Sequence, residues 1–255
     1  ANSKGNFKEV TESVLPGTQN GLWQSITTFD IDHDGDQDYL VGNWGLNSKF
    51  KSSQEFPMKM YYDDFDTNGT FETIVAVEKN GNYYPTMGLD ELAEEFSGML
   101  KKKFNSYKSF AGKTVEEIFD PKMLEKAALF EVHNLKSGYL RNDKGKFTFV
   151  PFSNKMQVSP ITSFVKTDFD GDGKEEVFAA GNYFGVSPYH SRFDGFSGAL
   201  IKDQKTIYLG NQIGIDLTQK AVRHLDILTL NGKKYLLVTI NNKKAEVYEL
   251  PMTKN

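Results

Sequence analysis

The stretch that decides the predicted fold of this chain is Asp168-Phe169-Asp170-Gly171-Asp172-Gly173-Lys174-Glu175-Glu176. Oxygen-bearing side chains stand at its positions 1, 3, 5 and 9, a glycine at position 6 and an apolar residue at position 2. The same pattern occurs twice earlier, as Asp30-Ile31-Asp32-His33-Asp34-Gly35-Asp36-Gln37-Asp38 and as Asp64-Phe65-Asp66-Thr67-Asn68-Gly69-Thr70-Phe71-Glu72. We call residues 30–38, 64–72 and 168–176 the first, second and third loops. Three copies in one register predict one shared structure and one shared chemistry.

The chemistry that fits this pattern is the binding of a hard cation such as calcium. Calcium takes about six to eight oxygen ligands, several of them carboxylates, and backbone carbonyls complete the set. The glycine allows the sharp turn that brings both ends of a loop onto one ion. The sequence therefore predicts about three Ca²⁺ sites. The predicted ligands, with position 7 giving its backbone carbonyl, are Asp30, Asp32, Asp34, Asp36 and Asp38; Asp64, Asp66, Asn68, Thr70 and Glu72; and Asp168, Asp170, Asp172, Lys174 and Glu176.

A simpler explanation of the pattern is that Asp, Asn and Gly merely form good turns. A turn does not require acidic residues at alternate positions, so we favour metal binding. The second loop carries one charge less at position 5, where Asn68 replaces an aspartate, and supports the prediction less strongly.

The loops differ from EF-hands in their surroundings. An EF-hand has a helix on either side and a bidentate Glu at position 12. Position 12 here is Val41, Val75 or Ala179, and the flanking residues, such as 25–29, 73–77 and 161–166, have the β-branched and aromatic character of strands. Each acidic loop is therefore expected to close a β-hairpin.

The pattern D-x-D-x-D-G-x-x-[DE] between strands resembles the FG-GAP/VCBS repeat, the calcium-loop blade of integrin-α-type β-propellers. More narrowly, the chain is similar to the C-terminal region of bacterial VCBS-repeat, ASPIC/UnbV-associated surface proteins. The resemblance implies an all-β fold, a β-propeller or partial propeller of about four blades over residues 1–255. The segments that carry the narrower resemblance are 63–69, 100–107, 139–143, 145–148 and 180–185.

The spacing of the motifs agrees with such blades and places one insertion. A hairpin without a metal loop is predicted around Asn231-Gly232, a strong two-residue turn. Residues of about 87–128 read as a helical insertion, with a capping box at Thr114 and Glu117 and with Asp90 as the cap of a helix. The first and second loops are too close for a full blade between them. Either one blade is abbreviated or two loops share one blade.

Composition excludes several classes of function. The net charge is −4 and no basic face is evident, so nucleic acid is not an expected partner. No apolar run reaches the length of about 20 residues that a membrane span needs. The absence of cysteine rules out disulfides and thiol chemistry. Calcium loops of this kind indicate an extracellular, cell-surface or periplasmic location in a bacterium, where free calcium is plentiful.

Two classes of function remain open from the sequence. The favoured one is a calcium-binding surface propeller that serves as a structural module or binds a glycan or a protein. The alternative is a propeller-type polysaccharide hydrolase or lyase. No catalytic residue is predicted, because the four histidines are dispersed and the clustered acids already have a metal role. Open blade edges could also pair with a second copy or with the rest of a longer chain.

Two matching segments that follow metal hairpins are candidates for ligand contact. They are 42–47 and 181–185, and the second continues to residue 195. Aromatic faces beside amides and an Arg/Asp pair suit a carbohydrate or peptide. The competing interpretation is that these aromatics pack between blades. The candidate residues are Asn43, Trp44, Asn182, Tyr183, Tyr189, Arg192 and Asp194.

Overall fold

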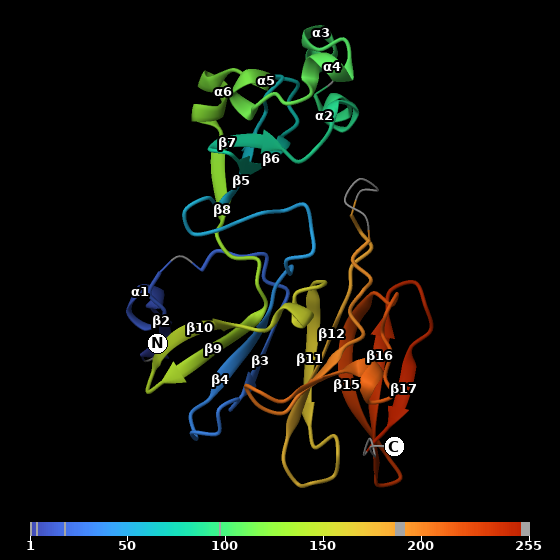
Figure 1. The fold of residues 1–255 in the computed structure, drawn as a ribbon. Coiled ribbons are helices and arrows are strands. Elements are labelled where there is room, and N and C mark those ends of the chain that lie inside the picture. Colours follow the sequence, from blue (N-terminus) through green and yellow to red (C-terminus); the bar gives the residue numbers. More distant parts are fainter. Residues whose placement is uncertain (1, 4, 18, 97, 187–191, 251–255) are drawn as a thin grey trace. The chain divides into compact units, whose positions relative to one another are not determined.

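The structure, a computed structural model, describes residues 2–3, 5–17, 19–96, 98–186 and 192–250 (Figure 1). The described chain is predominantly β, with antiparallel sheets of two, three or four strands, none of which closes on itself. It divides into two compact units. The larger unit comprises Ala1–Gly17, Leu22–Ser48 and Leu135–Asn255, and the smaller comprises Thr18–Gly21 and Lys49–Asn134.

The larger unit contains three principal sheets, which we call A, B and C. Sheet A has the order β10-β9-β4-β3, sheet B the order β11-β12-β13-β14 and sheet C the order β15-β16-β17. Every sheet is therefore a meander of neighbouring antiparallel strands. The strands are β3 (Ser25–Phe29), β4 (Asp38–Gly42), β9 (Gly138–Asp143), β10 (Lys146–Pro151), β11 (Ile161–Thr167), β12 (Glu176–Gly181), β13 (Ala199–Ile201), β14 (Ile207–Leu209), β15 (Val222–Leu230), β16 (Lys233–Ile240) and β17 (Glu246–Glu249).

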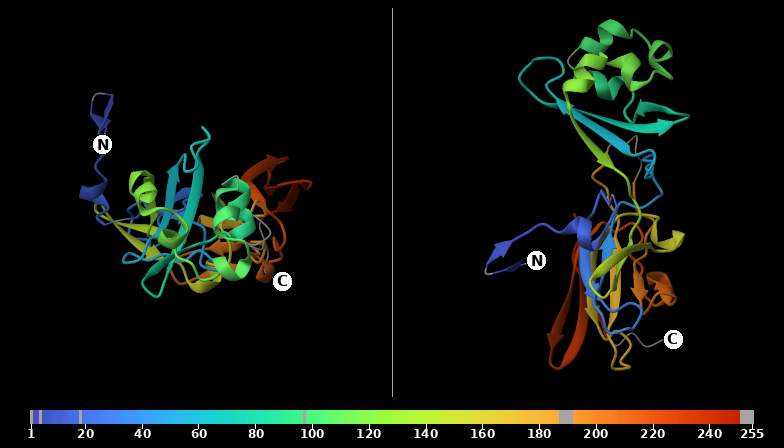
Figure 2. Two further views of the ribbon diagram at one scale, coloured as in Figure 1. Left: turned by 90° about the horizontal axis from the view of Figure 1, so that it is seen from above. Right: turned by 90° about the vertical axis from the view of Figure 1, so that its left-hand side faces the viewer.

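The first strands of the three sheets lie side by side, because β11 contacts both β3 and β15 (Figure 2). Equivalent hydroxyl groups join them. Ser25 Oγ donates to the carbonyl of Ile161 at 2.8 Å, and Thr162 Oγ1 donates to the carbonyl of Val222 at 2.7 Å. Sheet B therefore lies between sheets A and C.

Two apolar cores fill the spaces on either side of sheet B. One core joins Phe29 and Leu40 of sheet A to Val177 of sheet B. The other joins Phe178 of sheet B to Leu236 of sheet C. Alternate side chains of β12 thus pack into opposite cores, because successive side chains of a strand point to opposite faces of the sheet. A strand buried on both faces is apolar throughout, which is the character of residues 177–180.

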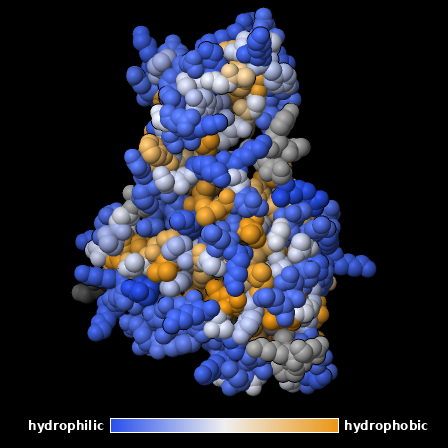
Figure 3. Space-filling model, viewed as in Figure 1, coloured by the Kyte–Doolittle hydropathy of each residue, from blue (hydrophilic) through white to orange (hydrophobic). Residues whose placement is uncertain are grey.

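Some apolar side chains of sheets A and C remain exposed. Ile26 of β3, Leu230 of β15 and Val247 of β17 are each more than half exposed. Figure 3 shows hydrophobic residues reaching the surface between hydrophilic ones over the larger unit. These positions belong to sheets that have a neighbour on one side only.

The smaller unit has its own sheet, sheet D, of order β7-β6-β5-β8. Its core joins Tyr61, Ile74 and Ala76 of the sheet to Phe96 and Phe119 of the helical segment. The strands are β5 (Met58–Asp63), β6 (Glu72–Lys79), β7 (Asn82–Pro85) and β8 (Ala128–Val132), and the helices are α2 (Leu89–Glu95), α3 (Met99–Lys103), α4 (Tyr107–Phe110), α5 (Val115–Ile118) and α6 (Pro121–Lys126).

Local capping explains where these short helices begin. The box at α5 is confirmed: Glu117 N–H donates to Thr114 Oγ1 at 3.2 Å, and Thr114 N–H donates to Glu117 Oε2 at 2.9 Å. The prediction that Asp90 caps a helix is wrong. Helix α2 begins at Leu89 after Gly88, whose N–H donates to Glu91 Oε2 at 3.0 Å, so Asp90 lies inside the first turn.

The chain enters the smaller unit after β4 and returns to sheet A in β9. This connectivity accounts for the short interval between the first and second loops. They belong to different sheets, A and D, and the first sheet is interrupted between its second and third strands. The inserted unit is larger than the helical stretch predicted at about 87–128, because it brings its own four-stranded sheet.

The remaining elements are short. Strands β1 (Asn2–Ser3) and β2 (Asn6–Phe7) pair with each other, and α1 (Thr11–Val14) follows. Two 3₁₀ turns, η1 (Asn154–Met156) and η3 (Gly210–Gln212), lie in connections of the larger unit. Within the described ranges, no helix combines the length and hydropathy that a membrane span requires.

Candidate metal centres

Each acidic loop closes an antiparallel hairpin, as the sequence predicts. The residue before the loop pairs with the residue at position 9 in all three copies. The pairs are Phe29 with Asp38, Asp63 with Glu72, and Thr167 with Glu176. The hairpin predicted around Asn231-Gly232 also forms, between β15 and β16, and both turn residues have positive φ.

The loops share a backbone conformation with two left-handed residues, at positions 4 and 6. The φ angles are 61°, 57° and 77° for His33, Thr67 and Gly171, and 95°, 88° and 87° for Gly35, Gly69 and Gly173. A Cβ at position 6 would meet no atom, so glycine is required there for its backbone freedom and not for space.

Carboxylates at positions 1 and 9 hold this conformation through backbone amides. In the first loop the N–H groups of Asp34 and Gly35 donate to the two oxygens of Asp30, at 3.1 and 3.0 Å. The N–H of Ile31 donates to Asp38 Oδ2 at 3.0 Å. The second loop repeats these bonds, including the bond from the position 2 amide to Glu72 at 3.0 Å. The third loop keeps the bonds from positions 6 and 2, the latter to Glu176 at 2.9 Å, but there the N–H of Gly171 at position 4 donates to Asp168 Oδ1 at 2.7 Å.

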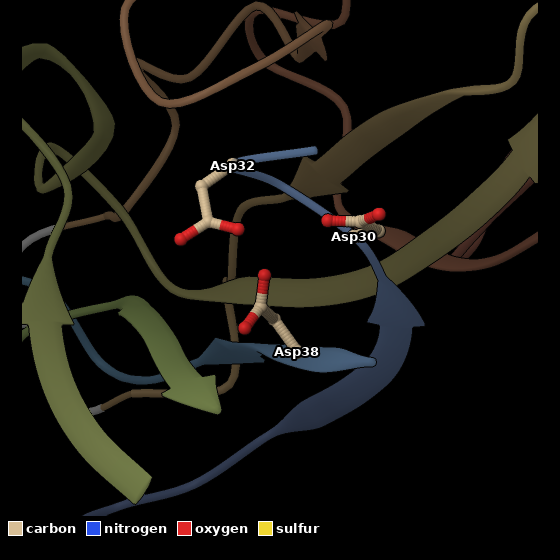
Figure 4. A group of neighbouring side chains, drawn as sticks. All are labelled: Asp30, Asp32 and Asp38. Atoms are coloured by element: carbon tan, nitrogen blue, oxygen red, sulfur yellow. The ribbon is translucent and has the colours of Figure 1, made fainter. Parts of the chain in front are cut away.

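The structure brings together the carboxylates of positions 1, 3 and 9. In each loop one oxygen from each of the three side chains lies within 4.8 Å of the others, a spacing that could hold one metal ion. Figure 4 shows Asp30, Asp32 and Asp38 turned toward a common space at the mouth of the β3–β4 hairpin. The three groups are Asp30, Asp32 and Asp38; Asp64, Asp66 and Glu72; and Asp168, Asp170 and Glu176.

The predicted ligands at positions 5 and 7 are not in these groups. Asp34, Asn68 and Asp172 each accept the N–H of position 7 with Oδ1, at 2.7–2.8 Å, which shapes the end of the loop. Asp36 accepts the N–H of Lys144 at 3.2 Å, so its carboxylate serves the neighbouring β9–β10 turn. The Asp36 side chain is therefore not drawn toward the acids of positions 1, 3 and 9 of its loop.

The first loop fits a cation. Asp38 is fully buried, and both of its oxygens accept backbone amides, from Ile31 and from Asn142 at 2.7 Å. Burial raises the pKa of Asp38 above its ordinary value. Asp32 Oδ1 is buried and accepts no hydrogen bond from any residue that the structure describes. An orphaned carboxylate oxygen in such a place is costly unless a positive charge or a donor meets it.

The second loop has the same group of three carboxylates and two further interactions that the sequence does not reveal. Glu72 is buried, and the hydroxyl of Thr70 donates to its Oε1 at 3.0 Å. Glu95, at the end of α2, has a pKa raised by burial and then by the charge of Glu72. Glu95 is 23 residues beyond Glu72 in the sequence, and the charge of Glu72 acts on it because α2 packs against sheet D, so no local pattern could have identified it.

The third loop already contains a positive charge. Lys202, which follows β13, places its Nζ 2.6 Å from Asp170 Oδ2, 3.2 Å from Glu176 Oε1 and 3.8 Å from Asp172 Oδ2. The hydrogen bond to Asp170 contributes most to a raised pKa of Lys202. Sequence reasoning missed this residue, because an isolated lysine after a strand carries no signal of its own.

The two asparagines among the predicted ligand-contact residues are buried. Asn182 Nδ2 donates to the carbonyls of Phe196, Leu217 and Lys220, and its Oδ1 accepts the N–H of Phe196. Asn43 accepts the N–H of Trp44 at 2.8 Å. The side-chain amide of Asn182 therefore joins distant segments of the chain, and the main chain of Asn43 is joined to the Ser137 hydroxyl.

The aromatic candidates pack on one another. The ring of Trp44 lies 5.5 Å from that of Tyr183 and 5.2 Å from that of Phe193. The guanidinium of Arg192 lies 4.1 Å from the ring centre of Phe184. The backbone carbonyl of Asp194 accepts the N–H of Gln219 at 2.8 Å. The candidate Tyr189 lies outside the described residues.

A cavity of about 330 Å³ opens beside the first loop. Its lining includes Asp32 and His33 from the loop and Asp203 and Lys205 from the turn after β13. The N–H of Gln204 donates to the carbonyl of Ile31 at 3.2 Å and ties that turn to the loop. Solvent therefore reaches the acidic group at the Asp32 side.

Comparison with known proteins adds no assignment to these centres. Protein-family models, curated proteins and solved structures were all searched, and none of them matches this chain.

Proposed function

We propose that this protein is a calcium-stabilised β-module of the FG-GAP/VCBS propeller type that works outside the cytoplasm as a structural or partner-binding surface module. The observation that carries the proposal is the buried oxygen of Asp32. It lies in a group of three carboxylates whose geometry recurs in two other hairpins. Three carboxylates repel one another, and a divalent cation removes that repulsion.

The role of the ion would be to order hairpins. In the first loop Asp30, Asp32 and Asp38 would hold Ca²⁺ at the junction of β3 and β4. In the second loop Asp64, Asp66 and Glu72 would do the same for β5 and β6. A bound Ca²⁺ supplies a divalent charge that offsets these carboxylates, and its binding free energy adds to folding free energy.

A propeller arrangement is supported by the order of sheets A, B and C. Propeller blades are antiparallel sheets of about four strands arranged around a channel. Here the first strands β3, β11 and β15 are neighbours, and the hydroxyl of Ser25 and that of Thr162 make equivalent bonds to the next sheet. We propose sheets A to C as consecutive blades of a partial propeller.

The exposed apolar residues of sheets A and C suit further partners. Ile26, Leu230 and Val247 would be covered by additional blades of a longer chain, by a second copy or by another protein. We propose a binding or structural role rather than a polysaccharide-cleaving enzyme, since the clustered carboxylates would hold metal ions in the loops.

The direct test is thermal unfolding in millimolar calcium and in excess EGTA, with Asp32→Asn as the variant. A ligand at 100 times its Kd stabilises by about 2.7 kcal/mol, so chelation should lower Tm by roughly 5–10 °C in a domain of this size. Asp32→Asn should lose part of that response. A melting curve that ignores EGTA contradicts the proposal.

A matched control removes an acid that belongs to none of the loops. Asp226 is exposed on β15, and its Oδ1 accepts the N–H of Ile227, a bond that asparagine can preserve. Asp226→Asn should keep the full calcium response. An equal loss in both variants would assign the response to net charge instead of a site.

A further inference from the structure

The third loop differs from the other two in the cation that reaches it. The ammonium of Lys202 is within 3.2 Å of one oxygen of Asp170 and one of Glu176, and within 3.8 Å of Asp172. Asp170 and Glu176 are two of the three carboxylates that form the acidic group of this loop. An ammonium has three donors and no acceptor, which suits a group made of carboxylate oxygens.

Strand register explains why a lysine reaches this place. Val177 pairs with Ile201 across β12 and β13, so the next residues along the two strands are Glu176 and Lys202. The residue opposite position 9 of the loop therefore lies within reach of the acids. Its position is set by the sheet and does not depend on the loop sequence.

The equivalent position in sheet A holds another cation with a different partner. Tyr39 pairs with Leu140, so Arg141 stands opposite Asp38. Its guanidinium donates to Asp143 Oδ2, from Nε at 3.2 Å and from Nη2 at 2.9 Å. In sheet D, pairing of β6 with β7 begins at Ala76 and Pro85, so β7 does not reach Glu72.

We propose that Lys202 is a tethered cation that takes the place of an ion in the third loop, so that this loop is held without calcium. The proposal rests on the proposed function only in that the other two loops bind Ca²⁺. A covalently attached ammonium is present at every calcium concentration. An ion can enter only after the ammonium leaves, because two positive charges so close together repel strongly.

Competition between the Lys202 ammonium and Ca²⁺ determines how far the calcium affinity of the third loop is reduced. The apparent affinity of an ion falls in proportion to the fraction of molecules in which the loop is free of the ammonium. If that fraction is about one in a hundred, the apparent affinity is about 100-fold weaker. Extracellular calcium modules bind with Kd values of about 10⁻⁴–10⁻³ M, so such a loss leaves the third loop without an ion at millimolar calcium.

The test counts Ca²⁺ ions per chain by equilibrium dialysis and metal analysis in wild type, Lys202→Met and Lys244→Met. Lys244 is an exposed lysine between β16 and β17 and serves as the control. Wild type and Lys244→Met should bind the same number, expected to be two, and Lys202→Met should bind one more. Equal numbers in Lys202→Met and wild type would overturn the proposal.

The absolute number in wild type separates this proposal from the calcium proposal itself. Wild type with no bound calcium contradicts the proposed function. The gain of one ion in Lys202→Met tests the lysine independently of that number. Wild type with three ions overturns the tethered-cation proposal and leaves the proposed function intact.

A second variant keeps the proposal testable if Lys202→Met does not fold. Asp170→Asn removes a carboxylate of the third loop in a chain that retains Lys202, and Asp32→Asn removes its counterpart in the first loop. Asp170→Asn should leave the number of bound ions unchanged, while Asp32→Asn should lower it by one. Loss of one ion in Asp170→Asn contradicts the proposal.

Discussion

The first and third loops have the same nine-residue pattern and the same backbone, but they satisfy their carboxylates in different ways. In the first loop a buried oxygen of Asp32 accepts no hydrogen bond from the described residues. In the third loop the Oδ2 oxygen of the equivalent residue, Asp170, accepts a hydrogen bond from Lys202 at 2.6 Å. The comparison teaches that a loop sequence specifies where negative charge gathers, and that the neighbouring strand decides whether a basic side chain reaches it.

The largest effects are expected from removing the position 9 carboxylate in either loop. Asp38→Ala leaves the amides of Ile31 and Asn142 without their acceptor, and Glu176→Ala does the same to the amide of Phe169 and removes a partner of Lys202. A buried unsatisfied group costs about 1–3 kcal/mol. Each variant should therefore lose roughly 2–4 kcal/mol in denaturant unfolding.

The dependence of these losses on calcium sharpens the comparison. The loss in Asp38→Ala should be larger in calcium than in EGTA, because the variant also loses an ion. The loss in Glu176→Ala should be equal in both. A calcium-dependent loss in Glu176→Ala would break the distinction between the loops.

Smaller and equal effects are expected at the position 6 glycines. Gly35 and Gly173 have φ of 95° and 87°, and neither would clash through a Cβ. Alanine in a left-handed conformation costs about 1–2 kcal/mol. Gly35→Ala and Gly173→Ala should each show this loss in denaturant unfolding, with and without calcium. Unequal losses would mean that the two loops differ in backbone as well as in cation.

Lowering the pH should reduce the stabilisation of the protein by calcium, because Asp38 of the first loop becomes protonated. Burial raises the pKa of Asp38, so in calcium-free folded protein this carboxyl takes up a proton at a higher pH than in the unfolded chain. The cost of keeping Asp38 charged is fully present above the raised pKa and is relieved as the pH falls from that value toward the ordinary pKa. Protonation also removes a ligand.

The measurement is the rise in Tm on adding calcium, between pH 7.5 and pH 5. The rise should shrink toward the acidic end. The charge of Lys202 should not change over this pH range. Its pKa is raised above the ordinary lysine value of about 10.4, so the ammonium stays protonated. A calcium response that grows on acidification would contradict the assignment to carboxylates.

The smallest effect is expected at Arg141, the counterpart of Lys202 in sheet A. Its ion pair with Asp143 is exposed on both sides, and exposed pairs contribute about 0–1 kcal/mol. Arg141→Ala should change stability by less than about 0.5 kcal/mol and should not change the number of bound calcium ions. A large loss of stability in urea unfolding would show that Arg141 also serves the first loop.

The hairpins and the acidic loops could be predicted from the sequence because their causes are local. Alternating carboxylates, a glycine at position 6 and β-branched flanks act within about a dozen residues, and so does the capping box of Thr114 and Glu117. The prediction failed at Asp90, where Gly88 and Glu91 form a competing start two residues earlier.

Other features were decided only by the tertiary structure, since they join segments far apart in the chain. Lys202 reaches Asp170 across 32 residues, through the pairing of β12 with β13. The burial of Asn43 and Asn182, and the interruption of sheet A by a unit with its own sheet, likewise follow from packing between distant segments. A sequence pattern places charge along the chain, but the cation that balances it depends on which strand lies alongside.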